Sequence, residues 1–290
     1  MICSAKTASQ NRRAFTLVEV LIALVITSLI MGASVTLLYT FLRNYEESSE
    51  YTMALQRGQL VMAYLEPVIL SAGLGLPSNP EDFSHCVEDG GLLKAWGEPV
   101  SIVDEGSKIR LIYSVVLNAV TADMTDFSPG ASISVPLTGS TSDIGMENAY
   151  SDLDGKKWIS FLSVGSPSVT NSTTSPLSVE FKGIKAVTSA QYDPLLLIRT
   201  MVAYVSGGVF YVKDNNGSTL PAVNGVLKVY FEELPGDVIK VSVLTRGDVK
   251  EASPISQNNI SWPDSNDMPT SDDYRYRLAL SSSLWRVRNR

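Results

Sequence analysis

Glu19 is the residue best placed to do chemistry in this chain, because its carboxylate lies at the start of a long apolar run. Residues 20–42 form a stretch of 23 residues without a charged side chain. As a helix rising about 1.5 Å per residue, they would span roughly 34 Å, enough for a hydrocarbon core of about 30 Å. A charge in such a helix costs about 2.5–3.5 kcal/mol at its centre and less near its ends. We therefore expect Glu19 to meet a cation and hydrogen-bond donors. The alternative is that Glu19 reaches the headgroup level and simply extends toward water.

The segment before the apolar run is basic. Residues 1–14 hold Lys6, Arg12 and Arg13 and no acidic residue, which predicts a cytoplasmic N-terminus. A secretory signal is cleaved after its apolar stretch. Here the basic pair and the small Ala14 come before that stretch, so a cut at this point would leave the membrane segment in the mature protein.

The run from Arg12 to Val20, Arg-Arg-Ala-Phe-Thr-Leu-Val-Glu-Val, resembles the start of type IV prepilins and pseudopilins. The resemblance implies cleavage after Ala14 by a prepilin peptidase, N-methylation of Phe15, and Glu19 as the fifth mature residue. In that family the Glu is thought to meet the positive N-terminus of a neighbouring subunit, which sets the register of assembly. Ala14 departs from the Gly that is usual before the cut. Because Ala is also small, we still expect cleavage.

Other candidate sites in the sequence are weaker. Asp152 and Asp154 followed by Gly155 form half of a calcium loop without its later Glu ligand, and an acidic loop precedes the C-terminal strand with Asp264, Asp267, Asp272 and Asp273. We expect a solvated turn in that loop. His85 and Cys86 are too few for zinc, and neighbours in an extended chain point apart. No phosphate-binding loop or Gly-x-Ser-x-Gly motif is present, so we expect no enzyme activity and no cofactor.

Arginines gather at the C-terminus. Candidates for docking an acidic partner are Arg275, Arg277, Arg286 and Arg288. The competing interpretations are an edge strand whose charges block aggregation, and DNA binding during uptake. Removal of the leader leaves 20 basic and 30 acidic residues, a formal charge of −10, which argues against a broad basic surface for nucleic acid.

These residues need a helix and a β-rich domain to position them. We expect a leader at 1–14, a transmembrane assembly helix at 15–42 and an amphipathic helix at 43–72. In the amphipathic part the apolar face should include Tyr51, Leu55, Val61, Met62, Leu65, Val68 and Ile69. Pro67 should kink this helix or mark its last turns. Gly32 is either a place where the helix bends or a tolerated glycine.

The rest of the chain predicts a β-rich periplasmic domain at 80–290, with a polar insertion around 118–176. Strands are expected at 109–116 and in two hairpins, 201–205 with 209–212 and 226–234 with 238–244. In the second hairpin Leu227, Val229 and Phe231 should share one face, as should Ile239, Val241 and Val243. The expected fold class is α+β, the pilin fold: a long N-terminal helix packed on an antiparallel sheet. After loss of Cys3 with the leader, Cys86 would remain as a lone packed cysteine.

The C-terminal region carries a second resemblance. Tyr-Arg-Tyr-Arg-Leu at 274–278 and Trp-Arg-Val-Arg-Asn at 285–289 are similar to the ending of PilW-like minor pilins, and Val-Ser-Val-Leu-Thr-Arg-Gly at 241–247 is similar to their penultimate strand. The expectation is a minor pilin in the inner membrane and then in the pilus, where it initiates assembly; a location at the tip is left open. Its implied partners are other minor pilins, the major pilin, the prepilin peptidase and the inner-membrane assembly platform. The alternatives are a minor pseudopilin of a type II secretion system, and a tip adhesin or DNA-uptake subunit whose ligand surface would lie in 118–176.

Overall fold

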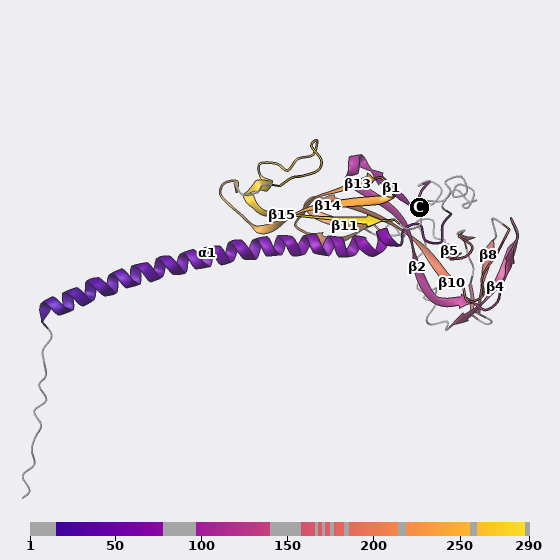
Figure 1. Cartoon of the computed structure of the whole chain (residues 1–290), viewed down its shortest axis with the longest axis horizontal. Helices are drawn as coiled ribbons and strands as arrows, with labels where there is room; N and C mark the ends of the chain where they lie inside the picture. Colours follow the sequence, from indigo (N-terminus) through magenta and orange to yellow (C-terminus); the bar gives the residue numbers. More distant parts are fainter. Residues whose placement is uncertain are drawn as a thin grey trace, which may run out of the picture. The chain divides into compact units, whose positions relative to one another are not determined.

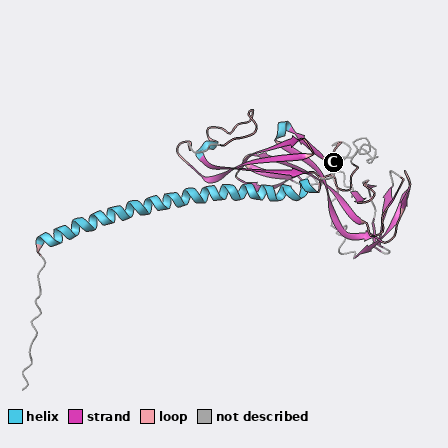
Figure 2. Cartoon of the chain, in the orientation of Figure 1, coloured by secondary structure: helices cyan, strands magenta, loops and turns pink. Residues whose placement is uncertain are grey.

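The protein is described from a computed structural model that covers residues 16–77, 97–139, 158–165, 168–169, 172–174, 177–182, 186–213, 219–255 and 260–287. The chain divides into two compact units, Met1–Ser49 and Glu50–Arg290. One helix, α1 (Leu17–Leu70), runs through the boundary, and strands make up most of the regular structure that follows it (Figures 1 and 2).

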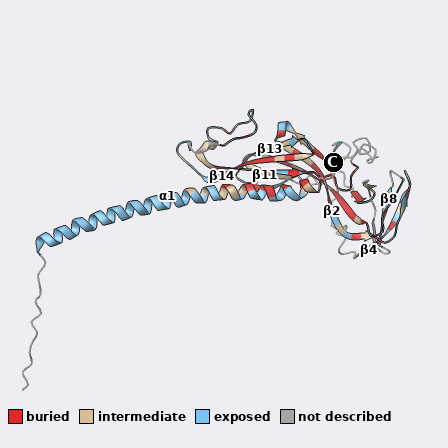
Figure 3. Cartoon of the chain, in the orientation of Figure 1, coloured by how far each residue is buried: buried red, intermediate tan, exposed pale blue. Residues whose placement is uncertain are grey.

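The first unit consists of α1 up to Ser49. Its side chains are exposed almost without interruption, as the pale blue of Figure 3 shows. One 18-residue window of α1 reaches a mean hydropathy of 2.4 with none of its residues buried. Four hydroxyls along this stretch donate to the carbonyl four residues earlier, at 2.7–2.9 Å, and these belong to Thr27, Ser28, Thr36 and Thr40. The polar groups are therefore satisfied within the helix, as an apolar environment requires.

In the second unit α1 buries one face. The buried residues are Ala54, Gly58, Val61, Met62, Leu65 and Ile69. The prediction for this face was right for its C-terminal half but wrong for Tyr51, which is 48% exposed. Ala54 and Gly58 continue the face instead, because here the helix lies so close to the sheet that only small residues fit. Pro67 falls in the last turn of α1, as predicted.

Fifteen strands occur in the described residues. They are β1 (Val100–Val103), β2 (Lys108–Thr121), β3 (Asp126–Phe127), β4 (Ser132–Gly139), β5 (Trp158–Phe161), β6 (Ser168–Val169), β7 (Ser172–Thr174), β8 (Leu177–Lys182), β9 (Val187–Thr188), β10 (Pro194–Ser206), β11 (Val209–Lys213), β12 (Thr219–Asn224), β13 (Val226–Leu234), β14 (Val238–Lys250) and β15 (Tyr276–Arg286). The largest sheet has the order β12-β11-β10-β2-β4-β8-β7, with β1 on β2 and β5 on β10, and β6 pairs with β5. A three-stranded sheet has the order β13-β14-β15, and β3 pairs with β9. All pairings are antiparallel, which confirms the α+β class.

Both predicted hairpins form. β10 pairs with β11 around Gly207 and Gly208, and β13 pairs with β14 around Gly236. The predicted strand at 109–116 is part of β2. The predicted face of β13 was wrong at Leu227, because a register shift between Val226 and Lys228 turns this residue toward the opposite side of the sheet.

Two separate apolar cores stabilise the second unit. The first joins α1 to both large sheets through Leu65, Leu111, Phe210, Phe231 and Val241, among others. The second lies farther along β2 and β10, where strands β3, β4, β5 and β8 contribute to it. Its centre is an aromatic trio, Phe127, Phe161 and Phe181, with ring centroids 4.9–6.3 Å apart.

At the end of the second core, one buried carboxylate and two hydroxyl groups form hydrogen bonds within the chain. Asp193 is 4% exposed and accepts hydrogen bonds from the backbone N–H of Ser163, at 3.0 Å, and from the Ser163 hydroxyl. Its own N–H donates to the Thr121 hydroxyl at 2.9 Å. These contacts fasten the segment before β10 to the ends of β2 and β5. The domain boundaries expected from the sequence, including the insertion at 118–176, stay predictions.

Candidate functional site

Glu19 lies in the first turn of α1 and is bonded to Thr16, the residue just before the helix. The Glu19 carboxylate accepts from the Thr16 N–H at 2.9 Å and from the Thr16 hydroxyl at 3.0 Å, and the Glu19 N–H donates to that hydroxyl at 3.3 Å. This is a capping box, in which two otherwise unpaired backbone donors at a helix start are satisfied reciprocally. The carboxylate thus has partners within its own chain, and it is exposed along with the rest of the first turn.

The residues expected to direct processing lie outside the described part of the chain. These are Arg12, Arg13, Ala14 and Phe15. Arg288 lies outside it as well, and so do Asp152 and Asp154 of the weak calcium candidate and the neighbours His85 and Cys86. The roles suggested for these residues stay predictions.

The second site is the join between α1 and β14, which sequence reasoning missed. The Glu50 carboxylate accepts from the backbone N–H groups of Asp248 and Val249, at 2.5 and 3.0 Å. About two helical turns farther along α1, the Arg57 guanidinium donates to the Arg246 carbonyl at 2.7 Å and to the Asp248 carboxylate at 2.8 Å. The pairing register of β14 with β15 is interrupted between Arg246 and Lys250, which forms a bulge. The Glu50 side chain of α1 forms hydrogen bonds with backbone groups of this bulge that do not pair with β15.

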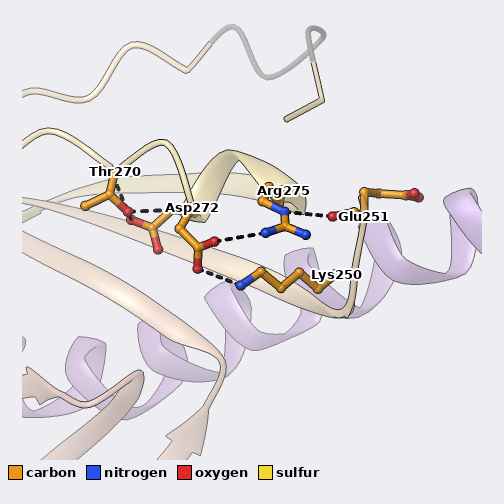
Figure 4. A network of polar contacts seen from close by, with 6 residues as sticks. Lys250, Glu251, Thr270, Asp272 and Arg275 are labelled. Atoms are coloured by element: carbon orange, nitrogen blue, oxygen red, sulfur yellow. Dashed lines mark hydrogen bonds and ion pairs between the residues drawn. The ribbon is translucent and has the colours of Figure 1, made fainter. Parts of the chain in front are cut away.

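The third site surrounds the start of β15 and includes part of the predicted arginine cluster (Figure 4). Asp272 accepts a hydrogen bond from Lys250 at 2.8 Å and lies 3.5 Å from a guanidinium nitrogen of Arg275. Arg275 also donates to the Glu251 carbonyl at 2.8 Å. The Lys250 hydrogen bond, together with the nearby positive charges, holds the pKa of the Asp272 carboxyl below its ordinary value. This network ties the segment after β14 to the strand that begins at Tyr276.

The other described arginines of the predicted cluster lie on β15 itself. Next to the network, the guanidinium of Arg246, which was not part of the predicted cluster, lies over the Tyr276 ring, 4.2 Å from its centroid. Arg277 is half-buried and Arg286 is exposed near the end of β15. The structure therefore separates two of the predicted docking residues: Arg275 holds a loop in place, and Arg286 lies at the other end of β15. Their docking role stays a prediction.

The acidic loop before β15 is built from local contacts. Asp267 pairs with Lys228 of β13, Asp264 accepts from the Asn266 N–H at 2.8 Å, and Asp273 accepts from both the N–H and the hydroxyl of Thr270 at 2.7 Å. Within the described residues, no group of three or more His, Cys, Asp or Glu side chains is arranged to hold a metal ion. Asp267 therefore ties the loop to β13, and Asp264 and Asp273 stabilise turns within the loop.

Comparisons with known proteins bear on the N-terminal site. Neither the curated proteins nor the solved structures give a match to the chain. Residues 9–35 match the family model of the prokaryotic N-terminal methylation motif, which includes the Arg-Arg-Ala-Phe segment, Glu19 and the start of the apolar helix. That motif implies processing by a prepilin peptidase, anchoring in a membrane and assembly with pilus components. The match, the apolar first half of α1 and the antiparallel sheets together support a type IV pilin-like or pseudopilin-like protein.

Proposed function

We propose that this chain is a minor pilin of the PilW type that helps to initiate a type IV pilus. The methylation motif at residues 9–35 is the observation that carries the proposal. In this scheme the peptidase cuts after Ala14, Phe15 is methylated, and the C-terminal domain faces the periplasm before the subunit enters the filament. The protein is a structural subunit without catalytic activity, and its partners are other minor pilins, the major pilin and the assembly platform.

The exposed first half of α1 supports an assembly role. Apolar helices gain no hydrophobic free energy from meeting one another in lipid, so close packing and polar contacts must hold them together. Glu19 supplies the polar contact: in the assembled state its carboxylate would meet the positive N-terminus of a neighbouring subunit. Within the single chain the carboxylate accepts from Thr16, so under this proposal it would exchange Thr16 for the neighbouring N-terminus on assembly.

Processing is the first measurement to make. The intact mass and N-terminal sequence of the membrane-extracted protein should show a chain that starts at methylated Phe15 when the peptidase is present. Without the peptidase the chain should start at Met1. An uncut chain in both strains would contradict the pilin proposal and leave a membrane-anchored β domain.

The two roles of Glu19 can be separated by its conservative variants. Gln also completes a capping box, so Glu19→Gln keeps the helix cap and removes only the charge. We expect this variant to be inserted and cleaved but not recruited into pili, as judged by its amount in sheared filaments relative to membranes. Thr16→Val, which removes the capping hydroxyl and keeps the charge, is the matched control and should still be recruited. Normal recruitment of Glu19→Gln would show that the residue acts only as a cap.

Gene neighbours distinguish a pilus subunit from a pseudopilin of type II secretion, the second candidate. Both share the methylation motif, the apolar helix and the role of Glu19. The chain length of 290 residues favours the pilus subunit, because pseudopilins of the corresponding type tend to be shorter.

A further inference from the structure

The outer face of the largest sheet carries a cluster of hydrogen-bond donors. Side chains alternate along each strand, and Ile109 of β2, Ala203 of β10 and Phe210 of β11 point into the first core. Their neighbours point to the opposite side. The register places them in two cross-strand rows, Lys108–Tyr204–Tyr211 and Arg110–Val202–Lys213. We call the five polar members of these rows the donor face: Lys108, Arg110, Tyr204, Tyr211 and Lys213.

The two tyrosine rings of the donor face are already stacked. Their centroids lie 5.7 Å apart with an interplanar angle of 25°. The Lys108 ammonium lies 5.6 Å from the Tyr204 centroid, on the next strand, and also pairs with Asp104 at 2.5 Å. The two rings therefore contact each other and Lys108 within the row. The hydroxyl groups are the parts of the two tyrosines that remain available to a ligand.

Several of these donors have no partner inside the described part of the chain. There, the hydroxyls of Tyr204 and Tyr211 and the ammonium of Lys213 make no hydrogen bond or ion pair, and all three residues are half-buried. Neighbouring strands are about 4.8 Å apart, so these groups lie close enough to bind one extended acidic segment. The arrangement is rigid because every residue is on a central strand of the sheet.

The chemistry of the donor face selects its ligand. The two phenol hydroxyls and the Lys213 ammonium are the donors without a partner in the described part of the chain, and they lie beside Lys108, which pairs with Asp104, and Arg110, so the complementary group is an anionic oxygen. Single-stranded nucleic acid is bound by stacking bases on free aromatic faces, whereas here the Tyr204 ring already contacts Lys108 and Tyr211, and the Tyr211 ring already stacks on Tyr204. Tyr and Arg are enriched among the residues that dominate protein interfaces. We propose that the donor face docks an acidic segment, rich in Asp or Glu, of a partner protein. This inference is independent of the role of Glu19.

Binding to the full-length protein in detergent tests the proposal. The probes are a fluorescent hexaglutamate peptide and a fluorescent oligothymidylate of matched charge, followed by anisotropy. The Tyr204→Phe/Tyr211→Phe variant removes both hydroxyls and keeps the stacked rings, and Lys213→Gln removes one charge. Lys182→Gln is the matched control, because it removes one exposed charge at the end of β8 and lies outside both the donor face and the predicted arginine cluster.

The expected result is peptide binding that weakens roughly tenfold in the double Phe variant and about threefold in Lys213→Gln, and stays unchanged in Lys182→Gln. Near-ultraviolet circular dichroism should show that each variant is folded. Three outcomes would overturn the proposal: no peptide binding, equal weakening by Lys182→Gln, or binding of oligothymidylate that is tighter than that of the peptide and insensitive to the loss of the hydroxyls.

Discussion

Gly58 shows how a single missing side chain fixes the distance between α1 and the sheet. A Cβ atom built on Gly58 would lie 2.3 Å from the Ser281 hydroxyl oxygen and 3.0 Å from the Ser281 Cβ, which is too close for unstrained contact. We predict that Gly58→Ala destabilises the protein by about 1 kcal/mol, because an overpacking cost of about 1–3 kcal/mol exceeds a helix-propensity gain of about 1 kcal/mol.

Thermal unfolding of the detergent-solubilised chain measures this effect. Removal of the clashing hydroxyl should rescue it, so Gly58→Ala/Ser281→Ala should recover most of the loss relative to Ser281→Ala alone. A Gly58→Ala variant that is more stable than the wild type would mean that Ser281 moves aside without cost.

The pH dependence of stability should report the Asp272 network. The pKa of Asp272 is lower in the folded protein than its ordinary value of 3.8, chiefly because of the Lys250 hydrogen bond. A carboxyl with a lowered folded pKa contributes stability fully above the unfolded value, and the contribution is lost as the pH falls through the folded value. We predict that Asp272→Asn is less stable than the wild type at pH 7 and that the difference disappears at acid pH. Urea unfolding from pH 7 to 2 measures it, and parallel curves at every pH would contradict it.

At the scale of elements, the join between α1 and β14 depends more on backbone groups than on charge. Arg57 contacts the Arg246 carbonyl as well as Asp248, and the Asp248 side chain is 64% exposed. An ion pair with one partner so exposed contributes little, typically below 1 kcal/mol. Loss of Arg57 would also leave the Arg246 carbonyl without this donor, at a cost of about 1–3 kcal/mol.

We therefore predict that Arg57→Ala destabilises the protein by about 2 kcal/mol and Asp248→Ala by less than half as much. Unfolding free energies of both variants and the double variant give the coupling, which should stay below about 1 kcal/mol. Faster amide exchange at Asp248 and Val249 in Arg57→Ala should accompany the loss. Equal effects of the two single variants would show that the ion pair dominates the join.

How much the sequence could reveal differs between local and long-range features. The helix, its apolar first half, both hairpins and the buried residues of β14 follow from local pattern and turn residues. The Thr16–Glu19 capping box is also visible in the sequence as Thr-x-x-Glu. By contrast, the partners of Glu50 and Arg57 are nearly 200 positions away in the sequence, which no local spacing encodes. The bulge that reverses Leu227 depends on the pairing register of β13 with β14, which alternation along β13 alone does not reveal. The donor face likewise requires the register of three strands.

For the whole second unit, the two cores predict two regions of different stability. Phe181 is fully buried in the second core and contacts Phe127 and Phe161, whereas the first core contains none of these three residues. Truncation of a buried Phe costs about 3–5 kcal/mol. We predict that Phe181→Ala loosens β4 and β8 first, while β13 and β14 keep their protection, because a local core can open without the rest of the structure. Hydrogen exchange with mass spectrometry measures this, with Phe231→Ala in the first core as the comparison.

Phe181→Ala also tests whether the region around the second core serves adhesion or assembly, and it does so better than a deletion of residues 118–176. That deletion would remove the end of β2 together with β3, β4, β5, β6 and β7, and with them Phe127 and Phe161 of the second core. Phe181→Ala instead weakens this region while α1, Glu19 and the first core remain. If the second core serves a ligand surface, a variant present at normal levels in the membrane should support piliation but not adhesion. If it serves assembly, piliation should fall with the adhesion. Loss of protection in β13 and β14 of Phe181→Ala would show instead that the two cores unfold together, because β2 and β10 run through both and transmit the loss.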